Sequence, residues 1–165
     1  MVSPIKLEDF YKLTKERRIQ HEVIHENVAH LIESNEFSNE TEFGWKSYHS
    51  LEEMYDWLDS LPKKYPDVVE ILNAGSTYEG RVMKGVKISY RRNNPAIFIE
   101  SGIHANEWIA PATATYLINE LLTSKNSSVR MLAESYDWYI FPSFNPDGYA
   151  YTRSSVSKTI EKFKY

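Results

Sequence analysis

An imidazole and a carboxylate stand three residues apart just beyond a short apolar run. The run is Ala96 to Ile99, and His104 and Glu107 follow it. Both side-chain types are common zinc ligands, and a catalytic zinc site needs three protein ligands and an open fourth position. No histidine follows His104 in the sequence. The segment therefore offers two ligands of a hydrolytic zinc site and leaves the third ligand unassigned.

The spacing H-x-x-E alone is weak evidence, because His30 with Glu33 and His49 with Glu52 share it. Those two pairs fall in or beside predicted helices, with no buried strand leading into them, and we interpret them as solvated surface pairs. The pair after the 96–99 run lies between a predicted buried strand and a helix. Catalytic groups of open α/β sheets collect at the carboxyl ends of strands. This context leaves a metal site and an ordinary strand-end pair both open.

A second metal hypothesis comes from residues 21–25, which read His-Glu-Val-Ile-His. On a helix, His21 and His25 would share one face and could chelate zinc, with Glu22 as general base. Residues 19–24 also alternate as a short strand does. There the two histidines would lie about 13 Å apart, at about 3.3 Å per residue, and could not share an ion. The alternative is two solvated histidines on a short strand.

Composition limits the classes of protein that the chain can represent. Its 165 residues suffice for one domain, or for a small domain joined to part of a larger one. Abundant aromatic residues, 14% of the chain, allow a sizeable core and argue against disorder. The net charge of −4 argues against a nucleic-acid partner. No apolar stretch is long enough for a membrane span, so no membrane partner is expected.

Signals of cellular location point in different directions. The first six residues lack the apolar core of a signal peptide, which at face value predicts a cytoplasmic chain. The chain has no cysteine, so disulfides carry no information. Two glycosylation sequons begin at Asn39 and Asn126. Such triplets arise often by chance and support secretion only weakly.

The elements that must position these residues alternate along the chain. Residues 7–18 predict an amphipathic helix, 19–24 a strand and the region around 28–32 a second helix, before a polar, acidic linker over 34–42. Ser50 with Glu53 forms a capping-box pattern that predicts a helix to Leu61, ending before Pro62. Further strands are predicted at 68–72, 85–90, 96–99 and 138–141, and further helices at 109–122 and 129–134. A turn is predicted at 145–148, where Asn145 would help to shape the rim of the site. The alternation implies an α/β sheet with some parallel pairing.

Six stretches together make the chain resemble the zinc metallocarboxypeptidases of the carboxypeptidase A/B family. They occur in the family's order and approximate spacing, at residues 48–54, 76–81, 95–108, 111–114, 136–140 and 145–149. Residues 1–36 are similar to the later part of that family's prosegment, a small α+β module that covers the active site before activation. The resemblance also explains residues 21–25 as a prosegment strand.

The resemblance implies a domain organisation. Residues 1–36 would be a partial prosegment-like module, 37–43 a linker, 44–152 the N-terminal half of a mixed-sheet α/β carboxypeptidase domain, and 153–165 a divergent tail. The linker region 35–44 contains no Lys or Arg, so it offers no site for a trypsin-like activating cut.

The resemblance also implies a chemistry. Members of the family are secreted enzymes that remove C-terminal residues from peptides and proteins, with one Zn²⁺ that activates a water molecule. By motif match, His104 and Glu107 are zinc ligands. Asn106 stands where the family usually has an arginine that contacts substrate, so Asn106 is a candidate substrate-binding residue and one cationic contact is missing.

The family's later zinc histidine, its general base Glu and its carboxylate-binding groups have no counterparts up to Tyr165. The simplest expectation is a truncated carboxypeptidase with weak zinc binding, poor solubility and an uncovered strand edge. One alternative is a non-catalytic short form that acts as a binding or regulatory module, with a full-length relative as partner through its prosegment-like part. A remote alternative is a zinc hydrolase that uses His21 and His25.

Overall fold

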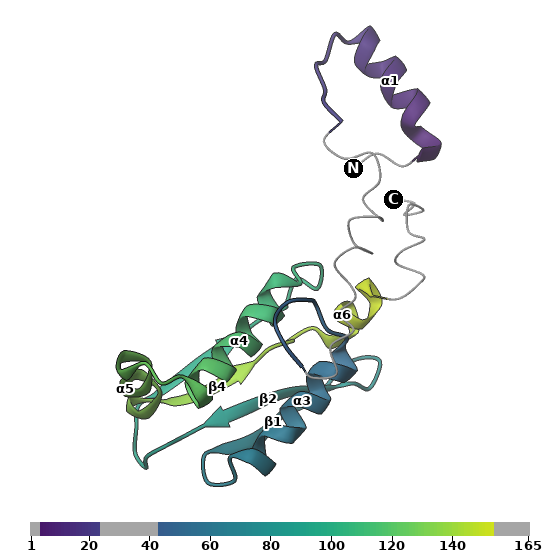
Figure 1. Cartoon of the computed structure of the whole chain (residues 1–165). Helices are drawn as coiled ribbons and strands as arrows, with labels where there is room; N and C mark the ends of the chain where they lie inside the picture. Colours follow the sequence, from purple (N-terminus) through teal and green to yellow (C-terminus); the bar gives the residue numbers. More distant parts are fainter. Residues whose placement is uncertain (1–3, 24–42, 154–165) are drawn as a thin grey trace.

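The computed structural model describes residues 4–23 and 43–153 (Figure 1). The first range holds a short 3-10 helix, η1 (Pro4–Lys6), and α1 (Leu7–Glu16), which confirms the predicted helix. The predicted helix around 28–32, the linker, His25 and the His30–Glu33 pair lie outside the described residues.

The predicted strand over 19–24 is wrong for its described part, residues 19–23, which form no strand. Arg18 has a positive φ of 53°, and the Ile19 N–H turns back to the Thr14 carbonyl at 2.9 Å. A strand needs a neighbour to accept its backbone hydrogen bonds. Within the two described ranges, no strand pairs with this segment.

The second range is built around a mixed four-stranded sheet. Its strands are β1 (Val69–Ser76), β2 (Val82–Ile88), β3 (Ala96–Glu100) and β4 (Asp137–Phe141), in the order β1-β2-β4-β3. The β1–β2 and β2–β4 pairs are antiparallel, whereas β3 and β4 are parallel. The α/β class and the expected parallel pairing are thus confirmed.

Four helices accompany the sheet: α3 (Leu51–Lys64), α4 (Ile109–Thr123), α5 (Ser127–Ser135) and α6 (Pro146–Thr152). The predicted capping box at the start of α3 is confirmed, since Ser50 Oγ accepts from the Glu53 N–H and Glu53 Oε2 accepts from the Ser50 N–H. The predicted end before Pro62 is wrong. Proline removes only one backbone donor, and the Tyr65 N–H still bonds the Leu61 carbonyl at 2.8 Å, so the helix continues for a last turn.

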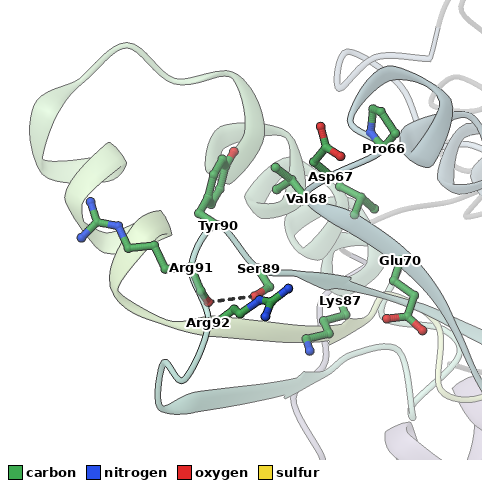
Figure 2. A pocket seen from close by; sticks show the side chains of 10 residues that line it. Pro66, Asp67, Val68, Glu70, Lys87, Ser89, Tyr90, Arg91 and Arg92 are labelled. Carbon is green, nitrogen blue, oxygen red and sulfur yellow. Dashed lines mark hydrogen bonds between the residues drawn. The ribbon is translucent and has the colours of Figure 1, made fainter.

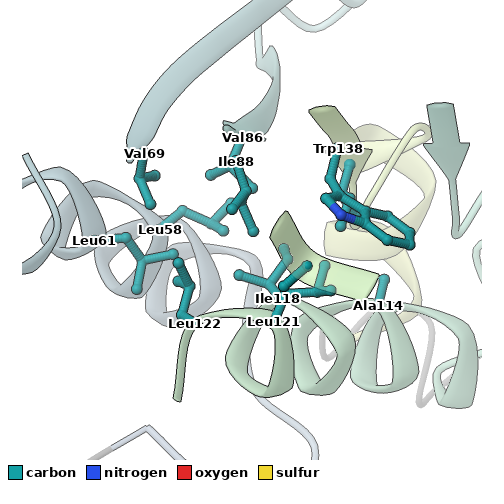
Figure 3. Close-up of a cluster of buried hydrophobic side chains, with 12 residues drawn as sticks. Leu58, Leu61, Val69, Val86, Ile88, Ala114, Ile118, Leu121, Leu122 and Trp138 are labelled. Atoms are coloured by element: carbon teal, nitrogen blue, oxygen red, sulfur yellow. The ribbon is translucent and has the colours of Figure 1, made fainter. Parts of the chain in front are cut away.

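The core lies between the sheet and the two longer helices (Figure 3). Leu58 of α3 and Ile118 of α4 meet Val86, Ile88 and Ile140 of the sheet, and all five side chains are fully buried. Full burial of such a side chain contributes about 1.5–3 kcal/mol relative to exposure. None of the helices in the described ranges is long and apolar enough to cross a membrane.

The expectation that β3 is a buried strand is wrong. Ile97 and Ile99 pack against the core, but Ala96, Phe98 and Glu100 on the other face are exposed. The reason is that the described core packs only on the Ile97 and Ile99 face of this edge strand and leaves its other face uncovered.

Candidate metal site

The parallel strands β3 and β4 finish at the same end of the sheet, where Glu100 of β3 lies opposite Phe141 of β4. The segments that follow are joined by backbone hydrogen bonds. The Ser101 N–H donates to the Phe141 carbonyl at 3.0 Å, and the Phe144 N–H donates to the Ser101 carbonyl at 2.8 Å. The loop 101–108 therefore leaves the sheet in a fixed direction.

His104 and Glu107 meet on this loop. The Glu107 N–H donates to the His104 carbonyl at 3.0 Å, and this turn brings His104 Nδ1 within 3.4 Å of Glu107 Oε1. Two donor atoms that are each about 2.1 Å from a tetrahedral zinc ion lie about 3.4 Å apart. The side chains are 73% and 56% exposed, so an ion and a water molecule can reach both donors. The donor types and their separation fit zinc, although the same distance also describes an ion pair.

Two glycines allow the close packing that holds this loop. Gly102 has a φ of 68°, and a β-carbon there would lie 3.2 Å from the Pro142 carbonyl oxygen. At Gly148, a β-carbon would lie 2.7 Å from the β-carbon of Ala105. A larger residue at either position would push the loop away from the β4–α6 connection.

Asn145 connects α6 to the same loop. Its Oδ1 accepts from the Gly148 N–H at 2.9 Å as the cap of α6, while its Nδ2 donates to the Ile103 carbonyl at 3.1 Å. Residues 146–152 therefore form a helix, where the sequence predicted a turn over 145–148. The contact of Asn145 with the Ile103 carbonyl lies one residue before His104. Asn145 is the residue that was predicted to help shape the rim of the site.

Asp147, a residue of α6, attaches this helix to the segment between β1 and β2. Its carboxylate accepts from the Thr77 hydroxyl at 2.7 Å, from the Glu79 N–H at 3.0 Å and from Arg81 Nη1 at 2.9 Å. Arg81 also contacts Glu79. Desolvation raises the pKa of Asp147, but the hydrogen bonds from Thr77 and Arg81 outweigh it, and the pKa lies below its usual value. Sequence reasoning missed this residue because N-P-D-G alone indicates a local turn.

Trp108 anchors the end of the loop where α4 begins. Its Nε1 donates to Thr152 Oγ1 at 2.9 Å, and its ring lies 5.6 Å from that of Tyr48 and 4.9 Å from the Arg153 guanidinium. Asn106, the candidate substrate-binding residue, is exposed between His104 and Trp108. Residues 4–23 and 43–153 contain no cluster of three His, Cys, Asp or Glu side chains that could hold a metal.

The other histidines have different surroundings. The interpretation of His49 and Glu52 as a solvated surface pair is wrong for His49, whose side chain is only 16% exposed. Its Nε2 lies 2.7 Å from the Gly44 carbonyl oxygen, its Nδ1 lies 3.5 Å from Glu53 Oε2, and its ring stacks on Phe43. Buried polar groups need such partners, and these give His49 a structural role.

His21 is exposed and lies against the rings of Phe10 and Tyr11, with centroids 5.3 Å and 5.4 Å away. Residues 21–23 are not helical, so the described part of the H-E-x-x-H string lacks the helix that its chelating geometry requires.

A cavity of about 370 Å³ lies at the opposite end of the sheet (Figure 2). It is near the end of β2, whose Ile88 pairs with Trp138 at the start of β4. Its lining is mixed in charge, with Lys87, Arg91 and Arg92 beside Asp67 and Glu70. The nearby cations disfavour a divalent metal ion, and the cavity is separate from the His104 loop.

Fold and site together define a mixed α/β protein with a candidate metal site at the carboxyl end of a parallel strand pair. Comparison with family models gives the family. The zinc carboxypeptidase model matches residues 54–162, and the carboxypeptidase activation peptide model matches residues 1–35. The chain belongs to the zinc carboxypeptidase family of metallohydrolases.

Known proteins agree with this assignment. Zinc carboxypeptidase A 1 of Anopheles gambiae is 48% identical over 157 residues, which cover 92% of this chain and 36% of the relative. The structure of thrombin activatable fibrinolysis inhibitor is similar with a TM-score of 0.82 at 32% identity, covering 93% of this chain and 41% of the other. Carboxypeptidase A of Helicoverpa armigera gives 0.73 at 30% identity, covering 90% and 39%. The chain thus spans less than half the length of each of these relatives.

Proposed function

We propose that this chain is part of a secreted zinc carboxypeptidase that removes C-terminal residues from peptides and proteins. His104 and Glu107 are, in this proposal, two of the protein ligands of its single Zn²⁺. The activity is proposed for the whole protein, because this chain covers 36% of the mosquito relative. The residue ranges 1–36, 37–43, 44–152 and 153–165 are proposed as prosegment-like module, linker, catalytic half-domain and tail.

The observation that carries the proposal is the 3.4 Å separation of His104 Nδ1 and Glu107 Oε1 on an exposed loop. A bound zinc ion would supply Lewis acidity and an activated water. The chain's own contribution is positional. His104 offers a neutral nitrogen donor, Glu107 offers a negative oxygen donor, and Asn145 holds the loop through the Ile103 carbonyl.

Asn106 is proposed to contact the substrate from between the two ligands. It is exposed, and its amide can both donate and accept a hydrogen bond, which suits a peptide group. The change Asn106→Ala should therefore weaken peptide binding to the zinc-loaded chain without weakening zinc binding. Isothermal titration with a short peptide and a separate zinc titration distinguish the two effects.

Zinc titration of the whole 165-residue chain tests the ligand assignment. Zinc alone is added in competition with a chromophoric chelator, and circular dichroism shows that each variant keeps its fold. We expect weak binding by the unmodified chain, because two of the expected three ligands are assigned. His104→Ala and the isosteric Glu107→Gln should each weaken it by at least about tenfold.

His21→Ala is the matched control, because His21 is also exposed but belongs to residues 4–23 and not to the loop of His104. It should leave zinc affinity unchanged. Loss of zinc with His21→Ala, together with no effect of His104→Ala, would instead favour a site at residues 21–25. A zinc affinity that changes with neither His104→Ala nor His21→Ala would favour the non-catalytic binding module.

A further inference from the structure

Helix α5 begins at an exposed asparagine that is also the first residue of a glycosylation sequon. Asn126-Ser127-Ser128 fits the acceptor pattern N-x-Ser/Thr. Asn126 is the N-cap of α5, with an extended backbone at φ −68° and ψ 126°. The residues Lys125 to Ser128 around it are all exposed. The triplet is therefore accessible in the folded chain.

The two atoms of the Asn126 amide have separate surroundings. Oδ1 accepts from the Ser128 N–H at 2.9 Å and from the Val129 N–H at 3.4 Å. These two bonds satisfy donors that the start of every helix leaves free. Nδ2, the atom that carries a glycan, takes no part in the cap. A sugar on Nδ2 leaves Oδ1 in place, so the modification is compatible with the helix cap.

The sequon also lies far from the candidate metal site. The loop of His104 enters α4 at Ile109, whereas Asn126 follows the other end of α4 at Thr123. A helix of 15 residues spans about 22 Å at about 1.5 Å per residue. Figure 1 shows α5 and α6 toward opposite ends of the sheet. A glycan at α5 would therefore leave the His104 loop open to substrate.

We propose that Asn126 is N-glycosylated, an inference that rests on the proposed secretion of the protein. The donor is a lipid-linked oligosaccharide pyrophosphate. A bond forms between Nδ2 and C1 of the first sugar, and the bond from C1 to the pyrophosphate oxygen breaks. The lipid pyrophosphate leaves with that electron pair, and Nδ2 gives up one proton to a base of the transferase.

The test uses the whole chain, translated behind a secretion signal with endoplasmic-reticulum microsomes. Tryptic peptides are analysed by mass spectrometry before and after a peptide N-glycosidase in ¹⁸O-water, which marks each modified asparagine as labelled aspartate. Peptide mapping separates Asn126 from the other sequon at Asn39. We expect the label at Asn126.

Three variants make the result specific. Ser128→Ala removes the sequon hydroxyl but keeps the backbone N–H that the cap uses, and it should abolish the label at position 126. Asn126→Asp keeps a capping oxygen and removes the acceptor nitrogen, with the same expected loss. Ser127→Ala is the matched control, because it leaves sequon and cap intact and should be modified like the unchanged chain.

An unmodified Asn126 in microsomes that glycosylate a control protein would overturn the inference, whether or not Asn39 is modified. That result would leave Asn126 with its capping role alone. The readout does not involve zinc. A modified Asn126 in a chain that fails the zinc titration would contradict only the ligand assignment, and the reverse result would contradict only the glycosylation.

Discussion

The carboxylate of Asp147 lies 2.9 Å from the guanidinium of Arg81, although 66 positions separate the two residues in the sequence. The contact attaches helix α6 to the connection between β1 and β2. At the start of the same helix, Asn145 holds the Ile103 carbonyl. Helix α6 is thus fixed between the 77–81 turn and the loop that carries His104.

Replacing this carboxylate should lower stability in a pH-dependent way. The pKa of Asp147 is lowered in the folded state, because the hydrogen bonds from Thr77 and Arg81 exceed the opposing desolvation. Its stabilising contribution is therefore present above its unfolded pKa of about 3.9 and is lost as the pH falls through the lower folded pKa. Asp147→Asn should lower the urea midpoint at neutral pH, and the difference from the unchanged chain should shrink in acid.

Asp67→Asn is the control for this series, because Asp67 is exposed at the far end of the sheet. It should have little effect on the midpoint at neutral pH. An Asp147→Asn deficit of equal size at neutral and acidic pH would show that the charge of Asp147 is not what stabilises α6.

Loss of the cap of α3 should weaken the helix that covers the core. Ser50→Ala removes the acceptor of the Glu53 N–H and should cost about 0.5–2 kcal/mol in the free energy of unfolding. Ser50→Asp keeps a capping oxygen and should cost much less. Urea denaturation of the three chains measures both values, and equal losses for the two variants would rule out the cap as the cause.

Gly85 is required by the packing of the sheet. A β-carbon there would lie 2.6 Å from Phe141 Cδ1 and 2.7 Å from the Ile140 carbonyl oxygen, and the backbone atom cannot move cheaply. Gly85→Ala should lower the free energy of unfolding by about 1–3 kcal/mol. At Gly80 nothing lies within 4 Å of a β-carbon, so Gly80→Ala carries only the cost of its φ of 80°. Thermal unfolding that ranks Gly80→Ala as the more harmful change would contradict this account.

Within the described residues, one edge of β3 has no partner strand, and this edge should promote self-association. Phe98 is 60% exposed on this strand, and an unpaired edge with an apolar side chain invites pairing with another chain. Phe98→Lys should reduce association in sedimentation velocity, and it should change the free energy of unfolding by no more than about 0.5 kcal/mol. Met131→Lys adds the same charge at a 68% exposed position on α5 and should not reduce it. Equal effects of the two variants would point to net charge alone.

Local sequence rules were sufficient wherever a structure depends on near neighbours. The capping box of Ser50 and Glu53 marked the start of α3, and the apolar run at 96–99 marked β3. The same run predicted that His104 and Glu107 lie just beyond the end of a strand. The family resemblance pointed to the same two residues as zinc ligands. These features depend on residues within a few positions of one another.

Three of the wrong predictions concern how a segment is surrounded in the folded chain. Ile19 to Val23 alternates as a strand does, yet strand formation requires a partner, and the described residues supply none there. β3 looks buried by composition, but the described core covers only its Ile97 and Ile99 face. His49 looks solvated by its polar neighbours, but the Gly44 carbonyl and the ring of Phe43 enclose it.

The sequence by itself determined the family, the α/β class and the two candidate zinc ligands, since each follows from short motifs in a recognisable order. Only the tertiary structure decided that His104 Nδ1 and Glu107 Oε1 lie 3.4 Å apart on a loop held by Asn145. It also decided that Asp147 pairs with Arg81. The contacts of Asn145 with Ile103 and of Asp147 with Arg81 join residues that are distant in sequence, and they form only when buried apolar surface brings the helices and the sheet together.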